Sequence, residues 1–222
     1  MFFEWCGLEP VRKICGVTNS EDALMVQRMG AEALGVNLYK GSKRFVELSR
    51  AREWLLGLEG KITRVAVVVN PAPEEVVELS SCGFFDGIQF HGDECPEFCA
   101  ACGFRYWIKA VRVRDEGDLR WALGFKTPYL LLDGWVSGNF GGSGVRVDWK
   151  MAADFVRQNP DRRVILAGGL TPGNIHSAVW EVGPYGVDVS SGVEISPGKK
   201  DEVLVSEFLG KSRGGTGLKS LA

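Results

Sequence analysis

Short apolar runs alternate with longer, more polar segments along the whole chain, and this alternation restricts the fold more than any other feature. Eight runs read as buried strands, and a segment with helical character follows each of them. Most of the runs are almost continuously apolar, which is typical of parallel strands covered on both faces. The predicted strands are residues 11–15, 33–37, 64–69, 86–90, 106–111, 129–133, 163–167 and 185–189.

The intervening segments carry helix signals. Thr18 or Asn19 can cap the first helix, which is expected to run to Met29, and Pro73 and Pro96 suit the first turns of two others. The remaining helices are expected near residues 49–58, 118–123, 148–158, 174–181 and 201–209.

Eight strand–helix units predict an α/β protein with a single-domain (β/α)8 barrel, the TIM-barrel fold. A doubly wound open sheet is the structural alternative. It needs fewer units and usually has a glycine-rich nucleotide turn after the first strand, and Gly16 alone is not such a turn. We expect residues 1–10 to form an N-terminal extension, residues 11–210 the barrel, and residues 211–222 a flexible C-terminal tail rich in glycine, lysine and serine.

Charge and hydropathy limit the partners. The formal net charge is −2 and no basic tract stands out, which argues against a nucleic-acid partner. No stretch approaches the roughly twenty apolar residues of a membrane span, and the first residues lack the pattern of a secretory leader. We therefore expect a cytoplasmic protein with no membrane partner.

Two loops late in the chain predict a phosphate site. Gly168 and Gly169 follow the seventh strand, and Ser190, Ser191 and Gly192 follow the eighth. Glycines leave backbone N–H groups uncovered, the serines add hydroxyl donors, and a helix opening at Ser191 would aim its positive end at the same place. Either loop alone could be an ordinary turn, but loops after strands seven and eight of a barrel frequently hold phosphate. A phosphorylated small molecule is the expected ligand.

Reactive side chains cluster at the predicted carboxyl ends of the strands, where the active sites of such barrels lie. Cys15 on strand one and Asp133 on strand six could form an acid–base pair across the barrel mouth. The alternatives are that Cys15 packs in the core and Asp133 caps the next segment. The other candidates are Asn37, Asn70, His91 and Asp188, with Gln89, Lys13 and Lys109 deeper in the strands and Arg44 on a loop at the same rim.

Lysine within a buried strand is rare unless it is paired. We therefore expect Lys13 and Lys109 to contact carboxylates such as that of Asp188. Arg44 could be a solvated loop charge, but a planar guanidinium on the rim also suits a substrate carboxylate. His91, followed by Gly92, could be no more than a turn residue.

Three of the six cysteines have a spacing that could indicate an iron–sulfur cluster. Cys95, Cys99 and Cys102 have the spacing of the cluster ligands of radical S-adenosylmethionine enzymes. They fall on a predicted helix in mid-chain, however, where positions i, i+4 and i+7 share one face. Free cysteine behaves as a small buried hydrophobe, so packing in the core is the preferred interpretation and a cysteine-cluster cofactor enzyme the alternative.

The combination of motifs resembles the phosphoribosylanthranilate isomerase family of tryptophan biosynthesis over roughly residues 11 to 210. The matching stretches are Lys13-Ile14-Cys15-Gly16-Val17-Thr18-Asn19, Ser42-Lys43-Arg44, Val67-Val68-Val69-Asn70, Gln89-Phe90-His91-Gly92, Leu131-Leu132-Asp133, Gly141-Gly142-Ser143-Gly144 with Asp148-Trp149, Gly168-Gly169-Leu170, Asp188 through Glu194, and Pro197-Gly198-Lys199-Lys200-Asp201. The chain departs from the family around Gly35-Val36-Asn37-Leu38, where a Phe-rich stretch is usual, and at Lys40-Gly41-Ser42, which lacks a frequent proline. These departures concern the lining of the aromatic pocket.

The resemblance implies an Amadori rearrangement of N-(5-phosphoribosyl)anthranilate to 1-(2-carboxyphenylamino)-1-deoxyribulose 5-phosphate, with no cofactor and no metal. It implies Cys15 as general base, Asp133 as general acid and Arg44 as the residue that holds the anthranilate carboxylate. Gln89 and His91 are expected to bind substrate beside the two phosphate loops. A monomer or a homodimer is expected.

The chemistry adds three hypotheses. Asp133 should be protonated when substrate is bound, in a water-poor pocket lined by Leu131 and Trp135. Lys13, two residues from Cys15 on the same strand face, should stabilise the thiolate. The glycine-rich segment 138–144 should close over the substrate.

Two further functions stay open at this stage. The related isomerase of histidine biosynthesis performs the same rearrangement, but it resembles a duplicated half-barrel with an aspartate as base on strand one. Cys15 and the lack of an obvious half-chain repeat argue against it. A catalytically idle phosphate-binding scaffold is disfavoured by the presence of Cys15, Asp133 and Arg44.

Overall fold

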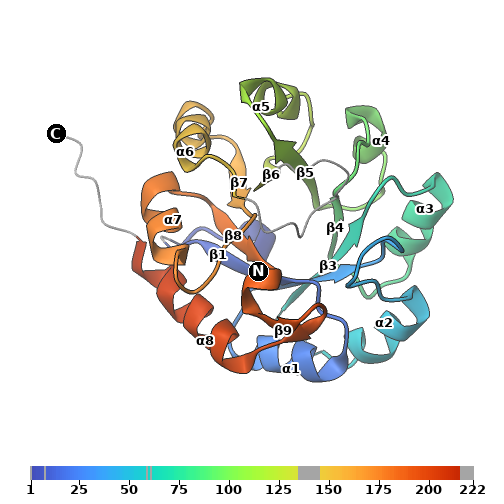
Figure 1. Ribbon diagram of the computed structural model, residues 1–222. Coiled ribbons are helices and arrows are strands. Elements are labelled where there is room, and N and C mark those ends of the chain that lie inside the picture. Colours follow the sequence, from blue (N-terminus) through green and yellow to red (C-terminus); the bar gives the residue numbers. More distant parts are fainter. Residues whose placement is uncertain (1, 8, 59, 61, 135–145, 216–222) are drawn as a thin grey trace.

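Eight parallel strands close into a barrel in the computed structural model, which describes residues 2–7, 9–58, 60, 62–134 and 146–215. Each strand pairs with the next along the chain, and the last pairs with the first. The helices form an outer ring in chain order (Figure 1). The strands are β1 Val11–Cys15, β2 Ala33–Asn37, β3 Thr63–Val68, β4 Gly87–Phe90, β5 Trp107–Val113, β6 Tyr129–Gly134, β7 Arg163–Leu166 and β8 Gly186–Val189.

The helices are α1 Ser20–Arg28, α2 Leu48–Leu55, α3 Pro73–Ser81, α4 Pro96–Ala100, α5 Glu116–Ala122, α6 Trp149–Gln158, α7 Ile175–Val182 and α8 Glu202–Lys211. The (β/α)8 fold and the eight predicted units are therefore confirmed, with boundaries moved by a few residues. The caps follow the expected chemistry, since the side chain of Asn19 accepts a hydrogen bond from the Asp22 N–H at the start of α1.

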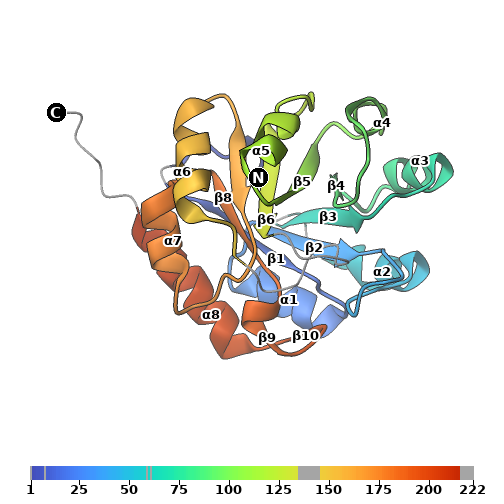
Figure 2. The ribbon, with the colours of Figure 1, turned by 45° about the horizontal axis from the view of Figure 1, so that its top comes forward.

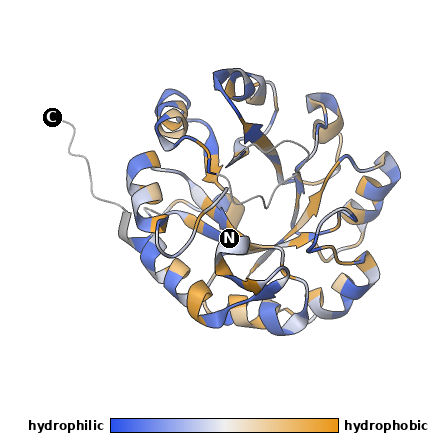
Figure 3. Cartoon of the chain, viewed as in Figure 1, coloured by the Kyte–Doolittle hydropathy of each residue, from blue (hydrophilic) through white to orange (hydrophobic). Residues whose placement is uncertain are grey.

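The strands separate two apolar cores, which explains why they are apolar without interruption. On β5, Ile108 and Ala110 face the barrel interior, whereas Trp107 and Val111 face the surrounding helices. The hydrophobic colour follows the strands and the hydrophilic colour the outer sides of the helices (Figure 3). Both faces of every strand are thus buried, as a barrel requires.

The segment before β1 packs against the barrel, although it was expected to be only an extension. A single 3₁₀ turn, η1 Phe2–Glu4, places Phe2 and Phe3 in the inner core. The Phe3 ring stacks on Tyr106 at 4.8 Å between centroids, and the hydroxyl of Tyr129 donates to the Phe3 carbonyl. These tyrosines stand at the beginnings of strands, so the turn covers the N-terminal end of the barrel and leaves the opposite end for a site.

The C-terminal part stays ordered somewhat further than expected. Helix α8 includes Lys211, and a 3₁₀ turn, η3 Ser212–Gly215, follows it. Residues 216–222, Trp135 and the segment 138–144 lie outside the described residues, so the expectations for them remain untested. No helix in the described parts of the chain is long and apolar enough to cross a membrane.

Candidate active site

A cavity of about 70 Å³ opens at the carboxyl ends of the strands. It is the place where residues far apart in the sequence converge. Eight of the ten site residues expected from the sequence line it: Cys15, Arg44, His91, Asp133, Gly168, Gly169, Ser190 and Ser191. The other two, Gln89 and Gly192, support the wall from behind, as described below.

The loops after β7 and β8 lie directly against each other. A Cβ atom on Gly192 would stand 1.9 Å from the Leu170 carbonyl oxygen, so only glycine permits this approach. The side chain of Asn174 donates to the Gly169 carbonyl at 2.9 Å, which keeps that oxygen occupied. A short 3₁₀ helix, η2 Ser191–Val193, begins at the predicted position.

The Ser190 hydroxyl adds to this arrangement. It is buried and has no hydrogen-bond partner within the described part of the chain. A buried donor without a partner loses free energy unless a ligand satisfies it. The loop after β8 therefore presents an unsatisfied donor to an anion in the cavity.

Cys15 stands at the end of β1 above a buried ion pair. Lys13 Nζ lies 2.8 Å from Asp188 Oδ1, and the Lys13 side chain is fully buried, so the expected pairing of Lys13 is confirmed. Burial raises the pKa of the Cys15 thiol, and the Lys13 charge and hydrogen bond lower it by less. Lys13 therefore favours the thiolate, as expected, but desolvation of the sulfur and the nearby charge of Asp188 leave the pKa of Cys15 above its ordinary value.

The partly buried Cys15 thiol should react slowly with iodoacetamide at neutral pH, because its pKa is raised. We expect the alkylation rate of Cys15 to rise with pH to a midpoint above 9.0, the ordinary value for cysteine, because the thiolate is the reactive form. Mass spectrometry of the Cys15 peptide measures the rate, and the exposed Cys95 provides an internal reference. A Cys15 midpoint below about pH 7 would show a stabilised thiolate and contradict this prediction.

His91 lies beside the carboxyl group of Asp133. The side-chain N–H of Gln89 faces His91 Nδ1 at 3.0 Å, so the ring proton belongs on Nε2. That atom lies 3.3 Å from Asp133 Oδ2, although without the alignment of a hydrogen bond. The Gly134 N–H donates to Asp133 Oδ1 at 2.9 Å. Gln89 itself is fully buried and does not line the cavity, which it adjoins through His91, and substrate binding by Gln89 stays a prediction.

Arg44 lies on the rim, as the sequence predicted, but it is already engaged. Its Nε and Nη2 groups donate to the two oxygens of Glu194 at 2.8 and 2.7 Å. Gly16 makes room for this side chain, since a Cβ there would stand 2.4 Å from Arg44 Cδ, and its φ of +72° also favours glycine. Sequence reasoning did not identify Glu194 as a site residue, although Glu194 is the last residue of the matched stretch Asp188 through Glu194.

Lys109, the other lysine predicted within a strand, is also paired. Its partner is the carboxylate of Glu94, which sequence reasoning did not identify. Lys109 Nζ lies 2.7 Å from Glu94 Oε2 and donates to the Gly92 carbonyl. Glu94 in turn accepts from the backbone N–H groups of Asn70 and Gly92. This buried group fixes the loop that carries His91.

The cysteine-bearing helix does not place three sulfurs on one buried face. Helix α4 begins at Pro96, which leaves Cys95 exposed at its cap, whereas Cys99 and Cys102 are buried. The packing prediction is therefore wrong for Cys95 and right for the other two. Burial raises the pKa of Cys99 to about 12, as expected of a packing thiol. Among the described residues, no group of three or more His, Cys, Asp or Glu side chains could hold a metal.

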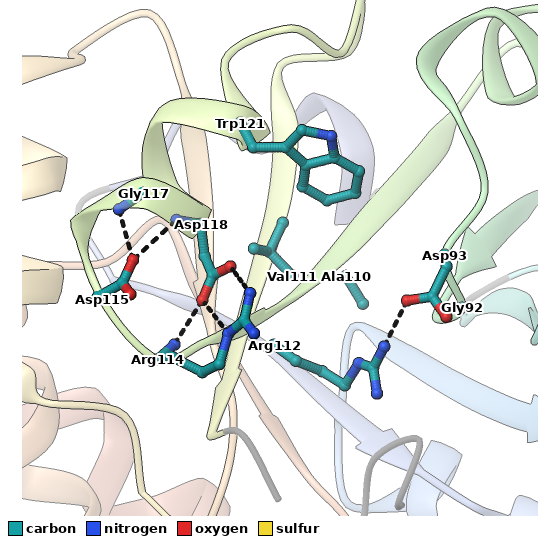
Figure 4. Close-up of a pocket in the computed structure, with 10 residues that line it drawn as sticks. All are labelled: Gly92, Asp93, Ala110, Val111, Arg112, Arg114, Asp115, Gly117, Asp118 and Trp121. Atoms are coloured by element: carbon teal, nitrogen blue, oxygen red, sulfur yellow. Dashed lines mark hydrogen bonds and ion pairs between the residues drawn. The ribbon is translucent and has the colours of Figure 1, made fainter. Parts of the chain in front are cut away.

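A larger cavity of about 530 Å³ lies between the loop after β4, strand β5 and helix α5 (Figure 4). Its charges are paired, with Arg112 Nη2 2.5 Å from Asp93 and Arg114 Nη2 2.7 Å from Asp118. Trp121 forms one side. None of the ten expected site residues, all of which the structure describes, lies on its wall. The residues predicted to carry the chemistry therefore gather at the smaller cavity.

Known proteins resemble this chain in sequence over almost its whole length. The family model for N-(5'-phosphoribosyl)anthranilate (PRA) isomerase matches residues 12–211. The N-(5'-phosphoribosyl)anthranilate isomerase of Thermotoga neapolitana is 45% identical over 203 residues, covering 91% of this chain and 98% of the relative.

Solved structures resemble the fold closely. The crystal structure of phosphoribosyl anthranilate isomerase from Thermotoga maritima has a TM-score of 0.84 and 38% identity, covering 92% of this chain and 99% of that one. A structure of the isomerase in complex with reduced 1-(o-carboxyphenylamino)-1-deoxyribulose 5-phosphate has a TM-score of 0.80 and 36% identity, with the same coverage.

Proposed function

The chain belongs to the N-(5'-phosphoribosyl)anthranilate isomerase family, and from this premise we propose how its side chains divide the reaction among themselves. It is an isomerase of tryptophan biosynthesis that rearranges phosphoribosylanthranilate to 1-(2-carboxyphenylamino)-1-deoxyribulose 5-phosphate. One observation carries the division of roles: Cys15, Arg44, Asp133 and the loops after β7 and β8 line the same cavity.

The substrate phosphate is assigned to the donors of Gly168, Gly169, Ser190 and Ser191. The support is the contact between the two loops and the buried Ser190 hydroxyl without a partner among the described residues. A phosphate held there contributes binding energy remote from the reacting atoms and fixes the sugar between the acid and the base.

Asp133 is assigned the role of general acid. Opening of the ribosylamine ring needs a proton on the ring oxygen as the nitrogen lone pair forms the C1′–N double bond. Asp133 is buried at the end of β6, where its Oδ1 accepts a hydrogen bond from the Gly134 N–H and its Oδ2 lies 3.3 Å from His91 Nε2. Its proton is required only in the complex with substrate, where the ligand covers the carboxyl group.

Cys15 is assigned the role of general base. It removes the C2′ proton of the ring-opened imine, which gives an enolamine that tautomerises to the ketone. Its raised pKa lowers the fraction of thiolate at neutral pH but makes each thiolate a stronger base, and the two effects oppose each other in the rate. Lys13 beneath it keeps a positive charge within reach of the sulfur.

Replacing Arg44 with alanine should affect binding more than chemistry. We expect KM to rise on the order of 10- to 100-fold and kcat to change less than about threefold, because hydrogen bonds to charged groups contribute roughly 1.5–3 kcal/mol and the carboxylate lies away from the reacting carbons. Steady-state kinetics measure both. The reverse pattern, a large loss of kcat at constant KM, would give Arg44 a role in the transition state instead.

The assigned reaction is tested by following the loss of anthranilate-type fluorescence with freshly made phosphoribosylanthranilate. The purified chain should consume this substrate and should leave the aminoimidazole substrate of the histidine-pathway isomerase unchanged. Turnover of the second substrate alone would contradict the assignment.

We further propose that residues 11–210 form the catalytic domain, with residues 1–10 before it and the tail 211–222 after it. For the assembly we propose a monomer or a homodimer, which sedimentation velocity distinguishes from larger oligomers.

A further inference from the structure

A buried cluster of three charged side chains stands behind the substrate cavity. Glu194 accepts hydrogen bonds from Arg44 through both carboxylate oxygens, and Lys200 Nζ lies 2.7 Å from the same Glu194 Oε1 that meets Arg44 Nε. The exposed side-chain fractions are 12% for Arg44, 4% for Glu194 and 0% for Lys200. Glu194 therefore bridges two cations out of contact with solvent.

The charge balance of this cluster favours an anionic ligand. Burial raises the pKa of Glu194, but the hydrogen bonds from Arg44 and the charge of Lys200 outweigh it and hold that pKa below its usual value. Burial lowers the pKa of Lys200, and Glu194 offsets part of this effect. An Arg44–Glu194 pair alone would be neutral. Lys200 Nζ donates to three oxygen atoms, which indicates an ammonium group, so the cluster carries one net positive charge that a substrate carboxylate can neutralise.

The hydrogen-bond geometry leaves the other half of Arg44 for a ligand. A guanidinium carries five N–H donors in a planar fork. Glu194 occupies Nε and one N–H of Nη2, so Nη1 and the second N–H of Nη2 have no acceptor among the described residues. A carboxylate can meet this end in a bidentate contact. Gly16 lets the Arg44 stem lie close to the end of β1, and Glu194 holds one side of the guanidinium.

Lys200 connects the cluster to the two halves of the site. Its ammonium group donates to the Cys15 carbonyl at 2.5 Å and to the Ser190 carbonyl at 3.3 Å. It belongs to a hairpin of β9 Glu194–Ser196 and β10 Lys199–Lys200, which lies beside α1 in two views (Figures 1 and 2). The Lys200 backbone N–H donates to Asp22 of that helix at 2.9 Å.

We propose that Glu194 is a positioning residue that aims Arg44 at the aryl carboxylate of the substrate, and that Lys200 supplies the charge that keeps this clamp cationic. The proposal rests on the carboxylate-binding role proposed above for Arg44. It places selectivity for a carboxylate-bearing aryl group partly in two residues that do not touch the substrate.

The test replaces Glu194 with glutamine, which keeps the shape of the side chain. KM for phosphoribosylanthranilate should rise about 10-fold, because Arg44 loses its charge-assisted bidentate partner, and kcat should change less than about threefold. The second substrate is N-(5-phosphoribosyl)aniline, which lacks the carboxylate. The preference for phosphoribosylanthranilate over this analogue, as a ratio of kcat/KM values, should fall about 10-fold. Glu207→Gln on the exposed surface of α8 is the matched control and should change neither quantity.

A purely structural role is separated by a double-mutant cycle. In an Arg44→Ala background, Glu194→Gln should change KM by less than about twofold, because the residue through which it acts is gone. A full 10-fold loss in that background, or an unchanged substrate preference in the single variant, would overturn the proposal. If Arg44→Ala raises KM and Glu194→Gln does not, the positioning role of Glu194 is contradicted while the binding role of Arg44 stands. If Arg44→Ala leaves KM unchanged, the role of Arg44 fails and the proposal falls with it.

Lys200→Met provides an independent measurement should the glutamine variant not fold. It leaves the Arg44–Glu194 hydrogen bonds in place and removes the extra charge. KM for phosphoribosylanthranilate should rise several-fold more than KM for the aniline analogue, because loss of the contacts to the Cys15 and Ser190 carbonyls affects both substrates and loss of the charge affects only the carboxylate. Equal effects on the two substrates would overturn the charge argument.

Discussion

We expect that replacing Asp133 with asparagine lowers turnover at least about 100-fold, while substrate still binds. Asparagine has nearly the same shape and can keep the contact with the Gly134 N–H, but it cannot deliver a proton to the ring oxygen. General acid catalysis typically contributes 10²- to 10⁴-fold, which sets the size of the loss. Steady-state fluorescence kinetics give kcat, and titration with the reduced product analogue gives the affinity.

The control for this variant is Asp161→Asn. Asp161 lies in the loop after α6 with a largely exposed side chain, and its replacement should leave turnover within about twofold. Near-normal turnover in Asp133→Asn would remove Asp133 from the mechanism. A loss that appears only in KM would reduce it to a binding residue.

Replacing Cys15 with alanine should lower kcat by a similar factor, at least about 100-fold, because no group remains to take the C2′ proton. Serine should restore activity only partly at best, since a hydroxyl is ionised far less readily than a thiol. The cavity left by alanine is small, and the buried Lys13–Asp188 pair beneath it is untouched, so the fold should persist. Circular dichroism checks the fold and the fluorescence assay measures turnover.

Cys95→Ser is the matched control, because Cys95 is exposed at the cap of α4 and does not line the cavity. It should retain full activity. A Cys15→Ala enzyme with more than about a tenth of the normal turnover would require a different base.

The barrel could be predicted because every strand has the same environment. Strands with one face toward the inner core and the other toward helices have no polar face, so eight near-continuous apolar runs identify them directly. The N-terminal turn could not be recognised in this way. Phe2 and Phe3 form no periodic pattern, and their burial depends on tyrosines at the beginnings of distant strands.

The cavity was predictable for a related reason. Strand ends of a parallel barrel meet at one rim, so Cys15, Asp133 and the two phosphate loops could be brought together from the order of the units alone. The charged groups behind the rim could not be predicted from the order of the units. Glu194, Lys200 and Glu94 act through contacts that depend on loop conformation, and their sequence neighbours give no periodic signal.

The direction of the pKa shift of Cys15 also could not be predicted from the sequence. Lys13 was correctly expected beside the sulfur, but the balance between its charge and the desolvation of the thiol depends on burial and on Asp188. The sign of such a balance follows only from the three-dimensional arrangement.

The most direct measurement of the central claim is a crystal structure of this protein with reduced 1-(o-carboxyphenylamino)-1-deoxyribulose 5-phosphate. The account predicts the phosphate on the donors of the loops after β7 and β8. The Cys15 sulfur should face C2′ from one side of the sugar chain, and an Asp133 oxygen should lie within about 3.2 Å of the former ring oxygen on the other. A phosphate bound elsewhere, or both groups on the same side of the sugar, would contradict it.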